Sequence, residues 1–241
     1  RGRRLTGMGA DIHRLEAGES ASTAPLPAER SVYLDAYLAP FRRWLDRDTV
    51  TEIMVNRPGE VWIEDAASPG MQRIDTPEID DRLVQRLAEQ VARVSHQGIN
   101  REHPLLGATL PDGARVQFCG PPASRKHWVM AIRRHRRLDL PLDAYDTGPL
   151  AGEMQFDLPD PQTQPIAFLR AAIRARRTIL ISGGTSTGKT TFLNAMLGEI
   201  PPEERVVLVE DTPELRFPGE NAVGLVAVKG ELGEAKVTAN E

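Results

Sequence analysis

One stretch decides the architecture of this chain: Gly183-Gly184-Thr185-Ser186-Thr187-Gly188-Lys189-Thr190. It fits the pattern G-x-x-x-x-G-K-[ST], a glycine-rich loop whose backbone amides surround phosphate oxygens when it connects a strand to a helix. Residues 178–181, just before it, form a short apolar and β-branched run that is typical of a buried parallel strand. Residues 191–200 have the composition of a helix. The order of strand, loop and helix therefore predicts a phosphate-binding site.

The residue types in this loop have physical reasons. Gly183 and Gly188 stand where the chain takes positive φ or where a Cβ would collide with an oxygen. The following helix directs its unpaired amides and the positive end of its dipole at the anion. Lys189 supplies a mobile charge for the β- and γ-phosphates, and the Thr190 hydroxyl is a ligand for Mg²⁺. We therefore expect ATP and Mg²⁺ as cofactors. The expected nucleotide-binding residues are Gly183, Gly184, Thr185, Ser186, Thr187, Gly188, Lys189, Thr190 and Thr191.

Acidic residues follow the next predicted strand. Residues 206–209 are a second β-branched, fully apolar run, and Glu210 and Asp211 come directly after it. Because the carboxyl ends of parallel strands meet at one edge of a sheet, these carboxylates should lie near the loop. We expect Glu210 to hold Mg²⁺ through water or to orient the attacking water. Asp211 and Glu214 are further candidates, although Pro213 interrupts the backbone before Glu214. An acidic strand end in solvent is the alternative.

Length and composition limit the class of protein. A chain of 241 residues suits two modest domains better than one large domain. The net charge of −4 gives no general attraction to nucleic acid, so we expect no stable nucleic-acid binding. The single cysteine, Cys119, lies in an apolar strand pattern that should bury it, and it suits the reducing cytosol. No apolar run approaches the roughly 20 residues that span a bilayer.

Composition changes along the chain divide it into four parts. Residues 1–29 read as a disordered tail, and 30–137 as an N-terminal α+β domain. Prolines and glycines at 138–164 indicate a linker, and 165–241 hold the phosphate-binding strand, loop and helix. The fold class is therefore α/β, with an N-terminal α+β domain joined by a linker to a partial P-loop NTPase domain.

Elements of both domains follow from periodicity and turn residues. Helices are expected over the apolar stripe between Val32 and Leu45, interrupted at Pro40, from Thr76 to Gly98, and from Pro165 onward. Strands are expected at 50–56 and 60–64, as a hairpin around Arg57-Pro58-Gly59, and at 105–110, 114–120 and 127–133.

Positive charge gathers at residues 125–137, within a net acidic chain. Three readings compete: contacts from the first domain to phosphates held by the second, a patch for an anionic membrane or nucleic acid, or a solvated face. Alternation along the predicted strand places Arg133 and Arg134 on opposite faces. These two arginines therefore cannot share one role.

Four segments together resemble the hexameric traffic ATPases of bacterial type IV secretion and conjugation: residues 182–191, 209–215, 110–117 and 132–133. The resemblance covers about residues 38–241. It implies a cytoplasmic ring ATPase, peripheral at the inner membrane, that works with the secretion machinery in pilus assembly and substrate transport. It also implies a RecA-like C-terminal domain whose nucleotide site is completed by the N-terminal domain.

Individual residues take roles from this resemblance. The segment at Glu210 matches the family's Asp box, which helps organise Mg²⁺ and water. Arg115 and Arg133 match positions where such proteins reach toward the nucleotide phosphates. With Lys189 and Glu210, these two arginines form the expected catalytic set, and Thr190 and Glu210 the expected metal ligands.

The end of the sequence carries a further expectation. Thr238 and Glu241 have the spacing of a capping box, which predicts the start of a helix. No segment matches the Walker B or histidine motifs of the family. We therefore expect a C-terminally truncated sequence that binds nucleotide weakly and hydrolyses it poorly. The alternatives are a type II secretion or type IV pilus ATPase and, from another class, a nucleotide-regulated docking module for membrane or nucleic acid.

Overall fold

The computed structural model of the chain describes residues 32–134, 158–227 and 237. Its first part contains α1 (Val32–Leu38), η1 (Ala39–Phe41), α2 (Arg42–Leu45), β1 (Val50–Val55), β2 (Gly59–Asp65), β3 (Met71–Thr76), α3 (Asp81–Val94), β4 (Leu105–Thr109), β5 (Arg115–Cys119) and β6 (Val129–Arg133). Its second part contains α4 (Pro165–Arg174), α5 (Lys189–Leu197), β7 (Val206–Glu210) and β8 (Ala222–Val226). The predicted tail at 1–29, residues 138–157 of the predicted linker and the predicted capping box at 238–241 lie outside the described residues.

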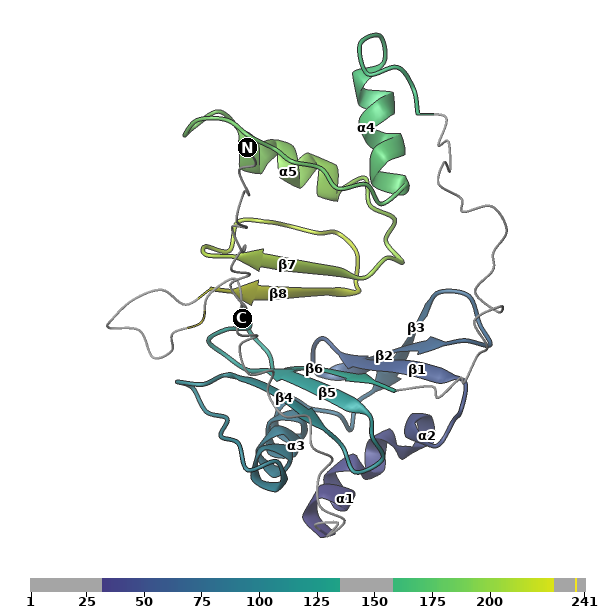
Figure 1. The fold of residues 1–241 in the computed structure, drawn as a ribbon, viewed down its shortest axis with the longest axis vertical. Coiled ribbons are helices and arrows are strands. Elements are labelled where there is room, and N and C mark those ends of the chain that lie inside the picture. Colours follow the sequence, from purple (N-terminus) through teal and green to yellow (C-terminus); the bar gives the residue numbers. More distant parts are fainter. Residues whose placement is uncertain (1–31, 135–157, 228–236, 238–241) are drawn as a thin grey trace, which may run out of the picture.

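The first part is a six-stranded antiparallel sheet in the order β3-β2-β1-β6-β5-β4. Helices α1, α2 and α3 lie together on one face of this sheet (Figure 1). The apolar stripe of α3 buries Val84, Leu87 and Val91 against that face, where they join the core with Phe41 and Phe118. This sheet and its helices contain the large hydrophobic core of the described chain.

The turn and strand predictions for this part are confirmed. β1 and β2 pair antiparallel across Arg57-Pro58-Gly59, where Gly59 takes a φ of 84° that favours glycine. β4, β5 and β6 form at the three positions expected, and Pro40 separates short helical turns rather than continuing one helix.

The start of α3 differs from the prediction, which placed it at Thr76. Thr76 is the last residue of β3, a strand the sequence did not predict, and it pairs with Gly59 of β2. The helix begins instead after Asp80, whose carboxylate accepts a hydrogen bond of 2.7 Å from the amide of Leu83. The side-chain cap at Asp80 therefore overrides the threonine and proline signal at residues 76–77.

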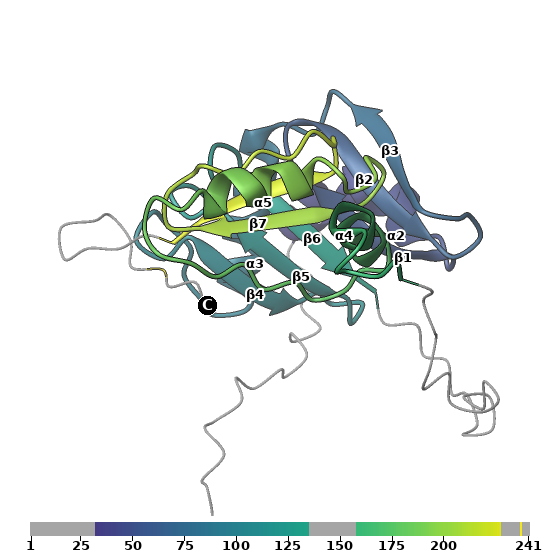
Figure 2. The same ribbon diagram turned by 90° about the horizontal axis from the view of Figure 1, so that it is seen from above.

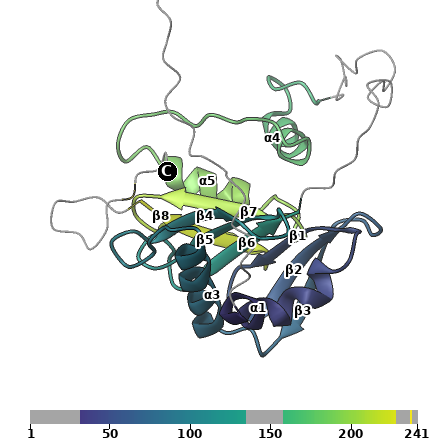
Figure 3. The ribbon, with the colours of Figure 1, turned by 60° about the horizontal axis from the view of Figure 1, so that its bottom comes forward.

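The second part lies on the other face of the sheet. There β7 and β8 form a parallel pair, and α5 lies over β7 on the side away from the large sheet (Figures 1 and 2). The order of layers is helices, six-stranded sheet, parallel pair and α5, and Figure 3 shows the helix layer from below. The connection between β5 and β6 reaches the edge of β8, where the amide of Val226 donates to Ala123 at 2.7 Å.

The predicted strand at residues 178–181 is wrong. This segment takes no strand conformation, and Leu180 is 90% exposed. A parallel strand needs hydrogen-bonded neighbours, and within the described residues β7 pairs with β8 alone, whose other edge meets residues 123–125. The predictions for the neighbouring elements are confirmed: α4 begins at Pro165, and β7 covers the expected run. Helix α5 also forms, but it begins at Lys189 rather than at residue 191.

The described helices are all unsuited to crossing a bilayer, because none of them is both long and apolar enough.

Candidate functional site

The loop at residues 183–190, called the glycine loop below, turns directly into α5. Gly188 stands at the helix N-cap with a φ of 85°, and Ser186 has a φ of 59°. No side chain caps the first amides of α5. A Cβ on Gly183 would lie 2.9 Å from Oγ1 of Thr187, so a larger residue there would force the Thr187 side chain to shift. The uncapped helix start leaves its amides and dipole available to an anion.

Side chains of the loop fold over it. Oγ1 of Thr187 donates to the carbonyl of Gly184 at 2.9 Å. The ammonium of Lys189 donates to the same carbonyl, which places its charge above the loop backbone. The predicted lysine is thus next to the glycines that should surround phosphate, as the sequence pattern requires.

A cavity of about 360 Å³ adjoins the glycine loop, between α5 and the end of β7. Its lining combines the start of the helix with the residues after the strand: Ile181, Lys189, Thr190, Leu193, Val209, Glu210, Asp211, Thr212, Glu214 and Leu215. The predicted lysine, threonine and acidic residues therefore share one cavity, while the other predicted residues, 183–188 and the exposed Thr191, are not part of its lining. The end of β7 and the start of α5 thus lie beside one cavity, although residues 178–181, just before the glycine loop, form no strand.

Glu210 has fixed partners in this cavity. Its Oε2 accepts from the amides of Glu214 and Leu215 at 2.8 and 2.7 Å. Its Oε1 accepts from the guanidinium of Arg125, which also donates to the carbonyl of Leu215 at 3.1 Å. Only 5% of the Glu210 side chain is exposed. Besides lining the cavity, Glu210 holds the backbone of residues 211–215, called the acidic segment below.

Asn194 of α5 holds the far end of the acidic segment. Its Nδ2 donates to the carbonyl of Glu214 at 3.2 Å, and its Oδ1 accepts from the amide of Arg216 at 2.7 Å. Sequence reasoning missed Asn194, and it saw Arg125 only as part of a basic run. No local signal in the sequence points to either residue, because Arg125 and Glu210 are 85 positions apart and Asn194 and Arg216 are 22 positions apart.

Arg115 and Arg133 lie side by side but apart from the glycine loop. They are register partners in β5 and β6, while Arg125 belongs to the connection at the opposite end of those strands. Five strand residues separate the two ends by about 13 Å. Nε of Arg133 lies 3.8 Å from a carboxylate oxygen of Glu52. The structure brings these two arginines together without joining them to the cavity at Lys189.

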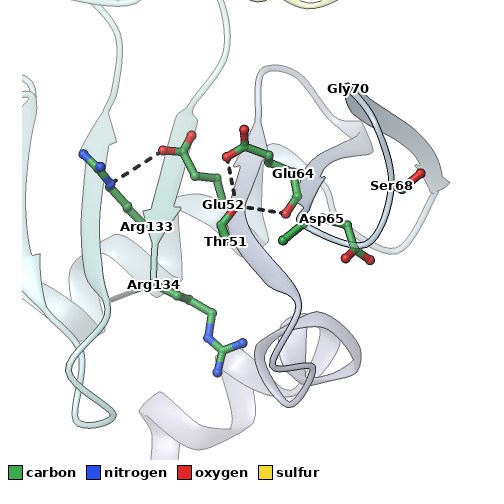
Figure 4. Close-up of a pocket in the computed structure, with 9 residues that line it drawn as sticks. Thr51, Glu52, Glu64, Asp65, Ser68, Gly70, Arg133 and Arg134 are labelled. Atoms are coloured by element: carbon green, nitrogen blue, oxygen red, sulfur yellow. Dashed lines mark hydrogen bonds and ion pairs between the residues drawn. The ribbon is translucent and has the colours of Figure 1, made fainter. Parts of the chain in front are cut away.

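A second cavity, of about 480 Å³, adjoins Arg133 beside the start of β1 and the end of β2. Figure 4 shows Arg133 directed toward Glu52 and Arg134 directed away from it. The guanidinium of Arg134 donates to the carbonyls of Arg47 and Val50. The two arginines have different partners, as the predicted alternation requires, and residues 135–137 of the basic run lie outside the described residues.

A buried polar cluster joins the two parts at the other end of β7 and β8. Asn56 donates to Asn221 at 2.8 Å, and Arg205 donates to Asn56 at 2.8 Å. Burial lowers the pKa of Arg205 from its ordinary value, and the charge of Glu52 opposes that shift. Arg57 adds a bond of 3.4 Å to the carbonyl of Glu220. The parallel pair is therefore attached to the large sheet at both ends.

Sequence comparisons match the chain to a family model and to named relatives. The model of a family described as type II/IV secretion system protein matches residues 35–240. The chain is 39% identical over 211 residues to a type IV secretion system protein PtlH homolog of Bordetella bronchiseptica, covering 82% of this chain and 61% of that protein. It is 32% identical over 228 residues to the type IV secretion system protein VirB11 of Bartonella henselae, covering 85% and 64%.

A solved structure shares the fold. The VirB11 ATPase of the Brucella suis type IV secretion system, in complex with sulphate, superposes with a TM-score of 0.69 at 32% identity. The match covers 80% of this chain and 61% of that one. The chain thus spans less than two thirds of the length of these relatives.

Proposed function

Because the chain belongs to the family of type II/IV secretion system proteins, we propose that it carries the nucleotide site of an ATP-hydrolysing motor subunit that energises type IV secretion, pilus assembly or conjugative transfer. The observation that carries this proposal is the cavity that joins Lys189 and Thr190 to the acidic segment. The relatives that match at 39% and 32% identity have type IV names, which favours type IV over type II secretion.

The residues of the cavity suit Mg²⁺ and the phosphates of ATP. The Lys189 ammonium would leave the Gly184 carbonyl for phosphate oxygens, and the uncapped amides of α5 would face the same anion. The Thr190 hydroxyl would hold Mg²⁺. Within the described residues no group of three His, Cys, Asp or Glu forms a ready metal cluster. Mg²⁺ does not need such a cluster, because it keeps several of its waters and is bound through one or two protein ligands together with phosphate oxygens.

The roles of Arg115 and Arg133 need a different placement of the large sheet. Both lie on the strand end away from the Arg125 contact. We propose that they neutralise phosphate charge after the N-terminal domain shifts against the glycine loop, or on the nucleotide of a neighbouring copy. We further propose that copies of the chain assemble into a ring, expected to be a hexamer. This ring would lie in the cytoplasm and contact the inner membrane peripherally, together with the rest of the secretion machinery.

The chain alone should turn over ATP slowly. In the proposed RecA-like domain the segment before the loop would be a central strand, yet residues 178–181 have no strand partner among the described residues. A loop whose preceding segment is loosely held positions phosphate less well, which costs rate before it costs binding.

Binding of a fluorescent ATP analogue tests the proposal. Lys189→Ala should weaken Mg·ATP binding by at least about tenfold, because it removes a charge-assisted contact to phosphate. Lys126→Ala is the matched control, since Lys126 is exposed and outside the cavity lining. Equal affinity of the Lys189→Ala and Lys126→Ala variants would contradict the assignment.

A further inference from the structure

One contact between the two parts of the chain involves Glu210, which lines the cavity. Arg125, from the connection between β5 and β6, reaches Glu210 at the end of β7. We propose that Arg125 is a positioning residue of the nucleotide site: acting through Glu210 and Leu215, it fixes the acidic segment against the cavity for Mg²⁺-bound nucleotide. The inference rests on the proposed function for its ligand and on the contacts alone for its structural part.

The bonding of Glu210 shows what Arg125 supports. The amides of Glu214 and Leu215 both donate to Oε2 of Glu210, so this carboxylate shapes the turn that carries the acidic segment. A buried carboxylate with two amide donors still carries a charge that burial disfavours. The guanidinium of Arg125 balances that charge at Oε1 and adds a bond to the Leu215 carbonyl. Without Arg125, the turn would rest on an unpaired, nearly buried anion.

The backbone and one glycine give Arg125 its reach. The Arg125 amide donates to the Gly224 carbonyl at 3.0 Å, and the adjoining Ser124 forms a bridge with Leu225. The Arg125 side chain then crosses β8 directly over Gly224, where a Cβ would overlap its Cγ, Cδ and Nε atoms. The connection between β5 and β6 thus lies beside β8 (Figure 1), and the Arg125 guanidinium reaches across β8 to Glu210 at the end of β7.

The geometry distinguishes positioning of the acidic segment from direct contact with the ligand. Arg125 is not among the residues that line the cavity, so it touches the acidic segment rather than the space beside Lys189. Both oxygens of its partner Glu210 accept hydrogen bonds from the protein, and Asp211 and Glu214 of the acidic segment are exposed and line the cavity. The predicted metal ligand Glu210 thus holds the acidic segment, and the Arg125 and Glu210 pair fixes the part of the cavity wall that carries Asp211 and Glu214.

Arg125→Met tests the inference with two measurements. Hydrogen exchange of the nucleotide-free chain should show faster exchange at the amides of Glu214 and Leu215, because Glu210 loses its balancing charge. Titration with a fluorescent ATP analogue should show about tenfold weaker binding in Mg²⁺ and unchanged binding in EDTA. Arg125→Lys should restore most of both, since a single nitrogen of Arg125 makes both contacts.

Two further variants keep the test independent of one substitution. Gly224→Ala should reproduce the Arg125→Met result, because the added methyl group displaces the Arg125 side chain. Arg57→Met is the control for docking of the two parts in general, because Arg57 bonds Glu220 at the far end of β8 and does not touch Glu210. It should leave the Mg²⁺ dependence of binding unchanged.

Each remaining result overturns the inference in a distinct way. An equal loss in Mg²⁺ and in EDTA would mean that Arg125 contacts phosphate directly. Tighter Mg·ATP binding by Arg125→Met would mean that Arg125 withholds Glu210 from the ion. Unchanged exchange at Glu214 and Leu215 would remove the positioning role. A wild-type chain that binds no Mg·ATP would instead refute the proposed function, while the exchange measurement would still decide whether Arg125 positions the segment.

Discussion

Helices α3 and α5 begin in opposite ways, one with a side-chain cap and one without. The amide of Leu83 in α3 donates to the carboxylate of Asp80, and the apolar stripe of the helix is buried on the large sheet. At α5 the cap is Gly188, which offers no side-chain acceptor to the first amides. A capped helix start stabilises the fold, whereas an uncapped one beside a lysine keeps its amides for a ligand.

The same contrast runs through the apolar side chains. The six-stranded sheet encloses fully buried residues such as Phe41, Ile63 and Phe118. In the second part Leu180, Val207 and Val209 are 90%, 49% and 51% exposed. We therefore expect the first part to contribute more to stability than the second part, which holds the proposed nucleotide site on a more open support.

Core truncation in the two parts should give the largest difference. Phe118→Ala should lower the free energy of unfolding by about 3–5 kcal/mol, because it leaves a cavity in a close-packed core. Leu208→Ala, in the two-stranded pair, should cost about 2 kcal/mol, because Leu208 lies outside the large core and its neighbours Val207 and Val209 are exposed. Urea unfolding followed by circular dichroism measures both. Equal losses would show that the second part has a core of comparable density.

Acid should weaken the first part through Glu60. Burial raises the pKa of Glu60, but hydrogen bonds from Trp62, Arg73 and Arg57 outweigh it, so the pKa falls below its ordinary value of 4.5. This stabilisation is present above pH 4.5 and is lost as the pH falls through the lowered folded-state pKa.

Glu60→Gln removes that dependence and should cost roughly 1–3 kcal/mol at neutral pH. The free energy of unfolding of the wild type should fall more steeply below pH 4.5 than that of Glu60→Gln. Parallel pH profiles of the two proteins would show that these hydrogen bonds do not favour the charged form.

Removing the cap of α3 should have a smaller effect. Asp80→Ala should destabilise the chain by about 1 kcal/mol, because the Leu83 amide loses its acceptor. Nucleotide affinity should stay unchanged, since this helix lies on the face of the sheet away from α5. A change in ATP binding on this substitution would contradict the assignment of a purely structural role to the start of α3.

Cys119 should produce the smallest effect, in labelling alone. Burial raises the pKa of the Cys119 thiol to about 11, so little thiolate exists at neutral pH. A thiol reagent should modify the native chain slowly and the urea-unfolded chain at once. Fast native labelling would mean that the sheet opens where Cys119 meets Ala123 and Val237.

Local sequence signals predicted the first part well. The turn at Gly59 and the stripe on α3 depend on residues next to one another in the chain, so they can be read directly. β3 was missed because its polar sequence pairs only at the sheet edge, with β2. The strand expected at 178–181 does not form, although its residues are apolar. A strand also needs hydrogen-bonded neighbours, which the described residues do not provide.

The site was predictable in its residues but not in its connections. The glycine loop and the acids after β7 follow from motif and strand order. Arg125 and Asn194 could not be assigned, because their roles depend on how β8 and α5 meet the acidic segment. Arg115 and Arg133 remain predictions, since the structure places them at the other end of their strands.

Hydrogen exchange with and without Mg·ATP is the most direct measurement of where the ligand binds. Mg·ATP should slow exchange at residues 183–191 and 210–216, because the glycine loop and acidic segment border the cavity. The strands of the six-stranded sheet should exchange at the same slow rate in both conditions. Unchanged exchange in those two segments, or protection gained only in the large sheet, would contradict the placement of nucleotide at Lys189.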